Sequence, residues 1–222
     1  MQKISKLSAF VLWTIGFLVL VPPSSDAFIL LEGTGPLGSF SGSLDYSFSN
    51  ATTAELEIIL QNTSPADNGG FLTAFVFNNP NNSITGISLT PSDTDFGLLG
   101  GSAFNNGVNG APYGKFDIGA STGGSFNGSG NPSKGIAVGA SETFLFSLTG
   151  TNLNTLVDQS FLDELSDGTG SGQGYQSFVS RFRGFEDNGS DKVPYSQAVV
   201  PEPSTLLLFG GGALSAFFRR RR

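Results

Sequence analysis

The sequence predicts an all-β protein: an antiparallel β-sandwich of jelly-roll type with one short helix, flanked by an N-terminal signal helix and a C-terminal hydrophobic helix. Glycine and phenylalanine are abundant, with 31 and 21 of the 222 residues, a composition typical of short strands joined by turns. Apolar and polar residues alternate over several stretches, which is the period of a half-buried strand. Strands do not alternate with long helical stretches, which argues against a parallel sheet. A β-barrel is the alternative architecture.

The chain divides into three parts by composition. Residues 1–27 are expected to be a signal peptide, residues 28–198 a β-sandwich body, and residues 199–222 a sorting or anchor segment. The body is long enough to form one domain with a hydrophobic core of its own.

The body is strongly acidic. The chain has 18 acidic and 11 basic residues; two of the acidic and six of the basic ones lie in the terminal parts, so 16 acidic and 5 basic remain and the net charge of the body is −11. Such a surface repels nucleic acid, which is therefore not an expected partner. The chain also has no cysteine and no histidine. This excludes Cys- and His-dependent nucleophiles and the usual ligands of zinc, copper and haem, so we expect neither enzymatic activity nor a cofactor.

The N-terminal part has the layout of a secretory signal peptide. Lys3 and Lys6 form a positive region ahead of an apolar run over residues 7–21. Small residues then occupy positions 25 and 27, which signal peptidase reads, so we expect cleavage after Ala27. An uncleaved N-terminal anchor is the alternative.

Five strands are predicted in the first half of the body. Residues 39–49 alternate cleanly, with Phe40, Leu44 and Tyr46 on one face and serines on the other. One later strand is apolar on both faces, which indicates a central position, and Thr85-Gly86 is expected to form a bulge. The five expected strands cover residues 28–31, 39–49, 55–61, 71–77 and 84–90.

Residues 91–133 form a segment rich in Gly, Asn and Ser with scattered aromatic residues. It is either a flexible linker or a set of long loops pinned by single aromatic side chains. The regular spacing of the aromatic residues favours pinned loops, with a short strand at residues 115–118.

Regular patterns return in the last part of the body. A helix is predicted over residues 154–165, with Asn154 as its N-cap and an apolar stripe at Val157, Phe161 and Leu165. The expected strands here cover residues 136–138, 142–149 and 178–185, and residues 193–199 are expected to lead out of the domain toward the tail.

Oxygen-rich loops are the candidate metal sites. Asp187, Asn188 and Asp191, beside Glu186, could supply the oxygen ligands that Ca²⁺ prefers, although the spacing is not that of an EF-hand. The alternative is a hydrophilic hairpin turn. Asp93 and Asp95 form a second, weaker candidate for Ca²⁺.

Two further charged groups have simpler explanations. The helix-end carboxylates Asp163, Glu164 and Asp167 point in different directions, so a solvated helix face is expected rather than a glycosidase pair. Arg181 and Arg183 alternate along a strand. They are expected to be solvated edge charges, with pairing to acidic residues or contact with sugar hydroxyls as the alternatives.

The C-terminal part combines a proline hinge, an apolar run over residues 205–218 and four arginines. An apolar segment stopped by positive charge is typical of a membrane segment whose arginines stay in the cytoplasm. As a helix the run spans about 21 Å, less than the ~30 Å hydrocarbon core, which favours a temporary anchor. An interfacial anchor or a C-terminal strand is the alternative. The arginines of this cytoplasmic stop are Arg219, Arg220, Arg221 and Arg222.

This segment resembles the PEP-CTERM sorting signal, also known as the ice-binding protein C-terminal domain. The tripeptide Pro201, Glu202 and Pro203, the apolar run and the terminal arginines stand in the order of that signal. The resemblance implies export in a Gram-negative bacterium, a transient anchor in the inner membrane, and recognition of the tripeptide by exosortase, a membrane-embedded transpeptidase. The implied destination is the cell surface or the extracellular matrix. Ice binding is not expected, because the body has no regular threonine ladder.

Together these features predict a secreted, non-enzymatic surface or extracellular-matrix protein that binds, or is embedded in, exopolysaccharide. Its expected partners are signal peptidase and exosortase during export, and exopolysaccharide afterwards. Two alternatives stay open: an extracellular carbohydrate-active enzyme that uses a carboxylate pair, and a Ca²⁺-dependent adhesion module.

Overall fold

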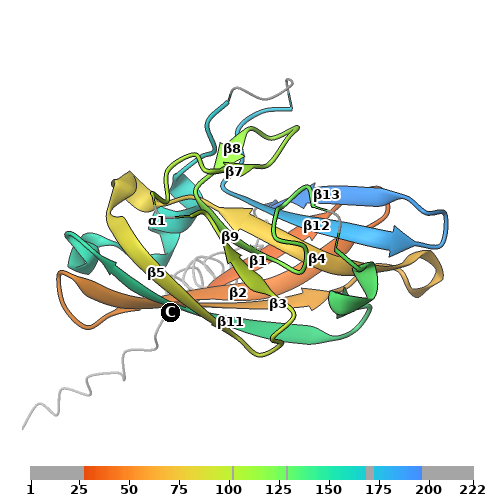
Figure 1. The fold of residues 1–222 in the computed structure, drawn as a ribbon, viewed down its shortest axis with the longest axis horizontal. Coiled ribbons are helices and arrows are strands. Elements are labelled where there is room, and N and C mark those ends of the chain that lie inside the picture. The colour runs from red at the N-terminus through yellow and green to blue at the C-terminus, as the bar shows by residue number, and fades with distance from the viewer. Residues whose placement is uncertain (1–27, 102, 129, 169–172, 197–222) are drawn as a thin grey trace, which may run out of the picture.

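Two antiparallel β-sheets packed face to face form the body of the protein (Figure 1). The computed structural model describes residues 28–101, 103–128, 130–168 and 173–196. The predicted signal peptide with its expected cleavage position at Ala27, the sorting segment and the two predicted terminal helices lie outside these residues. Within the described ranges, no helix is long and apolar enough to cross a bilayer. The predicted all-β sandwich is confirmed.

The strand order is β1-β2-β3-β11-β5 in one sheet, called sheet A, and β13-β12-β4-β9-β6 in the other, called sheet B, where β10 also pairs with β4. Sheet A consists of β1 (Ile29–Thr34), β2 (Ser39–Phe48), β3 (Thr53–Asn62), β5 (Ile84–Pro91) and β11 (Ser141–Gly150). Sheet B consists of β4 (Gly69–Phe77), β6 (Gly97–Leu99), β9 (Ile118–Ser121), β10 (Ile136–Ala137), β12 (Phe178–Phe185) and β13 (Ser190–Pro194). The remaining elements are the small hairpin of β7 (Val108–Asn109) and β8 (Lys115–Phe116), the helix α1 (Asp158–Asp163), and four 3-10 turns at Ala66–Asn68, Pro80–Asn82, Pro132–Lys134 and Leu153–Thr155.

The strands of sheet A follow the predicted alternation and put one apolar face against sheet B. On β3, for example, Leu56, Ile58 and Leu60 are fully buried. Along strand β5, Thr149 lies opposite Gly86 and Gly150 opposite Ile84, so the register skips one residue at Thr85. The expected bulge at Thr85-Gly86 is therefore confirmed.

Phenylalanine fills the space between the sheets. The Phe75 ring of β4 lies 4.7 Å from that of Phe144 and 5.6 Å from that of Phe178, measured between centroids. Phe146 also meets Phe75 edge to face. These distances are those of favourable aromatic pairs, which add to the free energy gained by burying the rings.

Strand β4 is central in sheet B and is buried on both faces, as predicted. Phe75 and Phe77 point into the main core, whereas Ala74 and Val76 point to the opposite face of sheet B. A second apolar cluster covers that opposite face. It consists of Ala74, Val76, Leu99, Val108, Phe116, Phe126 and Val179.

The Gly/Asn-rich segment supplies much of this cover, which supports the pinned-loop interpretation. Phe96 and Phe104 enter the main core, and Phe116 and Phe126 enter the second cluster. The hairpin of β7 and β8 lies on the side of sheet B away from sheet A (Figure 1). The strand predicted over residues 115–118 is divided in the structure between β8 and β9.

The predicted helix is shorter than expected and its apolar stripe is wrong. Helix α1 covers only Asp158–Asp163, and Asn154 belongs to the preceding 3-10 turn rather than to an N-cap. Val157 and Leu165 are 60% and 52% exposed, so only Phe161 of the expected stripe is buried. The cause is Leu156, whose extended backbone ends the 3-10 turn and whose side chain is buried in the core.

The structure contains one strand at the end of the body that the sequence did not predict. Strand β13 covers Ser190–Pro194, where the exit toward the tail was expected to begin at residue 193, and it pairs with β12 as an antiparallel hairpin. Residues 197–199 lie outside the described residues.

We expect Phe75→Ala to destabilise the protein by about 3–5 kcal/mol, because it removes a ring that four other phenylalanines surround. Phe48→Ala is the matched control: this ring is 52% exposed, and its removal should change the free energy of unfolding by about 0.5 kcal/mol or less. Denaturant unfolding measures both. Equal effects of the two substitutions would contradict the described packing.

Candidate functional site

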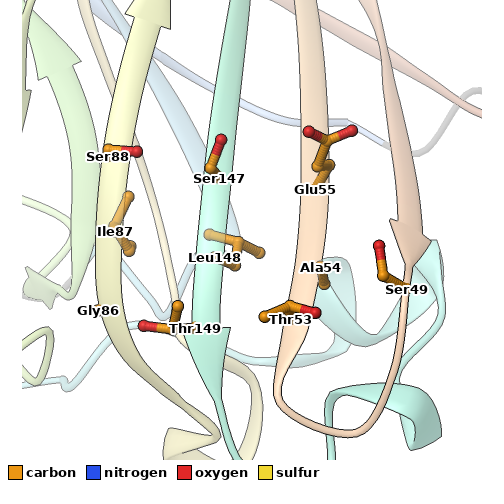
Figure 2. A pocket seen from close by; sticks show the side chains of 10 residues that line it. All are labelled: Ser49, Thr53, Ala54, Glu55, Gly86, Ile87, Ser88, Ser147, Leu148 and Thr149. Atoms are coloured by element: carbon orange, nitrogen blue, oxygen red, sulfur yellow. The ribbon is translucent and has the colours of Figure 1, made fainter.

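A groove crosses the outer face of sheet A and has a volume of about 460 Å³. Figure 2 shows its lining on β5, β11 and β3. Ser147 lies directly opposite Ser88 on one side and Glu55 on the other, and Thr149 lies in the same way between Gly86 and Thr53. The groove exists because glycine, serine and threonine are short, so little covers the backbone of the three strands there. The lining residues are Ser49, Thr53, Ala54, Glu55, Gly86, Ile87, Ser88, Ser147, Leu148 and Thr149.

The face around the groove carries negative charge without positive charge. The five strands of sheet A, all of them described, contain no lysine or arginine. Asp45 on β2 lies directly opposite Glu57 on β3, with Glu55 two residues away on the same face. A like-charge pair at opposite positions is unfavourable in an antiparallel sheet. The face is therefore suited to groups that donate hydrogen bonds to carboxylates.

The carboxyl groups whose pKa is most clearly raised hold the fold together instead of lining the groove. Burial raises the pKa of Asp117, although its carboxylate accepts hydrogen bonds from the Asn79 N–H at 2.8 Å and from the Asn106 N–H. Burial also raises the pKa of Asp158, which accepts from the Tyr46 N–H at 2.5 Å. These bonds tie the loops to the sheets.

The predicted calcium residues lie at the β12–β13 hairpin. Asn188 has a left-handed backbone there, and the Asp187 carboxylate accepts from the Gly189 N–H at 2.7 Å, as in a tight turn. Asp191 points elsewhere: its carboxylate accepts from the Leu37 and Gly38 N–H groups at 2.9 and 3.0 Å. A cation would compete with these amides. Calcium binding at Asp187, Asn188 and Asp191 stays a prediction.

Four of the remaining candidate carboxylates have partners within the protein. Asp95 forms an ion pair with Lys134 at 2.7 Å, and Asp93 accepts from the Asp95 N–H. Asp163 accepts from Gln159, and Glu164 accepts from the Asn81 N–H. Over the part of the chain that the structure describes, no group of three or more Asp, Glu, His or Cys residues is placed to hold a metal ion.

The expectation that Arg181 and Arg183 are solvated edge charges is wrong. Arg181 Nη1 donates to the carbonyls of Phe126 and Gly128 at 2.6 and 3.0 Å, and Arg183 Nη1 donates to that of Gly130 at 2.7 Å. Burial and the nearby Arg183 lower the pKa of Arg181. Both arginines thus fasten the glycine-rich loop to the outer face of sheet B.

Lys192 adds a third cation to this loop contact. Its Nζ donates to the Ala111 carbonyl and lies 5.8 Å from the centroid of the Phe126 ring. Burial, and secondarily Arg181, lower the pKa of this lysine. Three of the five basic residues of the body therefore bind the loops over sheet B. The strands of sheet A contain none of the five, so sheet A is anionic.

The sequence predicted neither the groove nor this cationic contact. The alternating strands signal a polar outer face on sheet A, but the groove depends on the register of β5 and β11, which are more than fifty residues apart in the chain. No local pattern contains that register.

Residues 199–222 match the family model of the PEP-CTERM protein-sorting motif. A comparison with curated proteins gave no match. The match covers only the tail, including the tripeptide Pro201, Glu202 and Pro203, and it confirms that the chain carries a PEP-CTERM sorting domain.

The class of protein follows from the β-sandwich and the tail together. It is a secreted β-sandwich protein targeted to exosortase, with sorting towards the cell surface through a C-terminal anchor. The tail thus indicates where the protein is sent. The groove on sheet A is the candidate site for the function of the domain at that destination.

We expect Arg181→Met to loosen the loop over sheet B, because it removes two charge-assisted hydrogen bonds of the kind worth about 1.5–3 kcal/mol each. Amide hydrogen exchange should accelerate over residues 122–128 while the strands of sheet A keep their protection. Arg183→Met, which removes one such bond, should give a smaller effect. Unchanged exchange in the Arg181 variant would show that the contact does not hold the loop.

We expect Glu202→Ala to block processing of the tail, since the match to the sorting motif implies exosortase processing and the resemblance to that signal implies that the enzyme recognises the tripeptide. The precursor should then accumulate in the membrane fraction, where mass spectrometry would find residues 199–222 still attached. Ser204→Ala changes a neighbouring position outside the tripeptide and should be processed like the parent. Normal processing of the Glu202 variant would refute this assignment.

Proposed function

We propose that this is a non-enzymatic protein of the cell surface or extracellular matrix, and that the outer face of sheet A binds exopolysaccharide. One observation carries the proposal: the groove across β5, β11 and β3 is lined by hydroxyl groups and a carboxylate on the open face of the sandwich. Sugars present many hydroxyls that both donate and accept hydrogen bonds, and serine, threonine and glutamate are matching partners.

The charge of the same face selects the kind of polysaccharide. Asp45, Glu55 and Glu57 accept hydrogen bonds from hydroxyls, and sheet A offers no cation to pair with an anionic polymer. Because like charges repel, a neutral polysaccharide fits this surface better than an acidic one. The surface is extended and shallow, which suits a long polymer that touches several strands at once.

The carboxylates support a binding role in preference to catalysis. Glycoside hydrolysis uses two carboxyl groups about 5–10 Å apart across the scissile bond. Glu55 alone among the residues that line the groove carries a carboxylate. Asp117 and Asp158, whose pKa values are raised, accept hydrogen bonds from backbone amides, a structural use that argues against their acting as general acids.

We expect Ser147→Tyr to weaken binding, because the new ring would fill the groove at its centre on β11. Ser43→Tyr is the matched control, since Ser43 also lies on the outer face of sheet A but two strands away on β2. The measurement is co-sedimentation with exopolysaccharide isolated from the cells that make the protein. Binding should fall about tenfold or more for Ser147→Tyr and stay near the parent value for the control.

Two results would count against the proposal. Equal binding by the parent and both variants would place the contact elsewhere on the protein. Retention of the protein at the surface of cells whose exopolysaccharide has been removed would show that polysaccharide is not what holds it there.

A further inference from the structure

The end of the described chain crosses from sheet B to sheet A. The Tyr195 N–H donates to the Phe178 carbonyl of β12, and the Ser196 N–H donates to the Glu32 carbonyl of β1, both at 2.8 Å. Gly33 permits this approach, because a Cβ there would lie 2.5 Å from the Pro194 carbonyl oxygen. The chain therefore leaves the described domain alongside β1 and antiparallel to it.

β1 is an edge strand of sheet A, and its outer side meets no further strand among the described residues. The N–H and C=O of one strand residue point to the same side, and the side alternates along the strand. Because the Glu32 carbonyl faces Ser196, away from β2, the backbone groups of Leu30 also face away from β2. Such a row of free groups is a template for another strand.

The apolar side chains of this edge are also exposed. Phe28 and Leu30 are 57% and 49% accessible, and Ile29 is only partly buried against the core. Edge strands in natural proteins are commonly protected by lysine, proline or a cover. β1 has neither lysine nor proline, and Glu32 is its only charged residue, so a cover would protect the apolar part of this edge.

We propose that the chain's own residues 197–200, Gln-Ala-Val-Val, dock on the free edge of β1 as a sixth strand of sheet A. These residues lie outside the described ones, but the bond from Ser196 to Glu32 sets their register. An antiparallel continuation places Ala198 opposite Leu30, Val199 opposite Ile29 and Val200 opposite Phe28. The apolar residues of the segment then cover the exposed apolar residues of the edge.

This occupant has an advantage over a second copy of the chain or an unrelated strand. The segment is tethered at Ser196, directly beside its docking site, so its effective concentration there is in the millimolar range or above. A second copy in dilute solution has no such tether. The inference is independent of polysaccharide binding, since it rests on a different edge of the sheet.

The docked strand ends where the sorting motif begins. Pro201 has no N–H to donate, and with Val200 opposite Phe28 the pairing reaches the first residue expected after signal-peptide cleavage. The tripeptide is thereby held at the rim of the sandwich. Release of the four docked residues would lengthen the tether by about 13 Å at ~3.3 Å per residue. Docking thus sets how far from the folded domain exosortase meets its motif.

Disulfide trapping in the full chain tests the register, because the chain has no cysteine of its own. Residues directly opposite each other in such a pair lie about 5.5 Å apart between Cα atoms, within the range of a disulfide. Leu30→Cys with Ala198→Cys should form an intramolecular disulfide at least about tenfold faster than Leu30→Cys with Gln197→Cys, whose side chains would point to opposite faces. The fraction oxidised is read on non-reducing gels of the protein in detergent.

Equal rates of disulfide formation in the two double-cysteine variants would indicate that the tail is free and would overturn the proposal. Dimers linked through Leu30→Cys would also overturn it, because they would place a second copy at the edge. A second measurement needs no substitution. The Leu30 amide should exchange at least about tenfold more slowly in the full chain than in a chain ended after Ser196. Equal exchange would likewise overturn the proposal.

Discussion

The burial of β4 on both faces is the constraint on which the rest of the domain depends. Its inward residues, Phe75 and Phe77, require an apolar sheet opposite, which sheet A provides. Its outward residues, Ala74 and Val76, require a second cover, which the Gly/Asn-rich loops provide with Phe126 and neighbouring aromatic side chains. Those loops have little regular structure, so cations of β12 and β13 fasten their backbone carbonyls to the sheet. Sheet A, sheet B and the loops over sheet B are thus all needed to bury β4 on both faces.

The two outer faces of the sandwich consequently differ. Sheet B is covered and carries most of the positive charge of the body, whereas sheet A is open, hydroxyl-rich and anionic. A secreted protein that is delivered to the cell surface by its tail exposes sheet A to whatever surrounds the cell. The groove at Ser147 is therefore placed where a matrix polymer would meet the domain, while Glu32 of β1 accepts a hydrogen bond from Ser196, the last described residue.

The strands whose burial depends on local sequence alternation could be predicted from the sequence. The period of two over residues 39–49 and 178–185 gave strands with nearly the observed bounds, and the two-sided apolar run gave the central strand β4. The helix failed because the spacing of Val157, Phe161 and Leu165 is compatible with a stripe, while the burial of Leu156 and the bond between Asp158 and Tyr46 decide the backbone. Those contacts are distant in sequence and leave no local signal.

The same limit applies to the candidate sites. The tail motif is contiguous, so its residues could be recognised directly, whereas the groove depends on strands that meet only in the fold. The partners of Arg181 also lie more than fifty residues away, and a strand read alone could show that this side chain alternates but not that a loop covers it.

Hydrogen-exchange mapping with fragments of the native exopolysaccharide can show whether the open face of sheet A is the binding surface. We expect slower amide exchange around the groove, at Gly86 and Ser88 of β5 and Ser147 of β11, with no change in the loops that cover sheet B. Slower exchange confined to those loops, or no change anywhere at saturating fragment, would contradict the proposal.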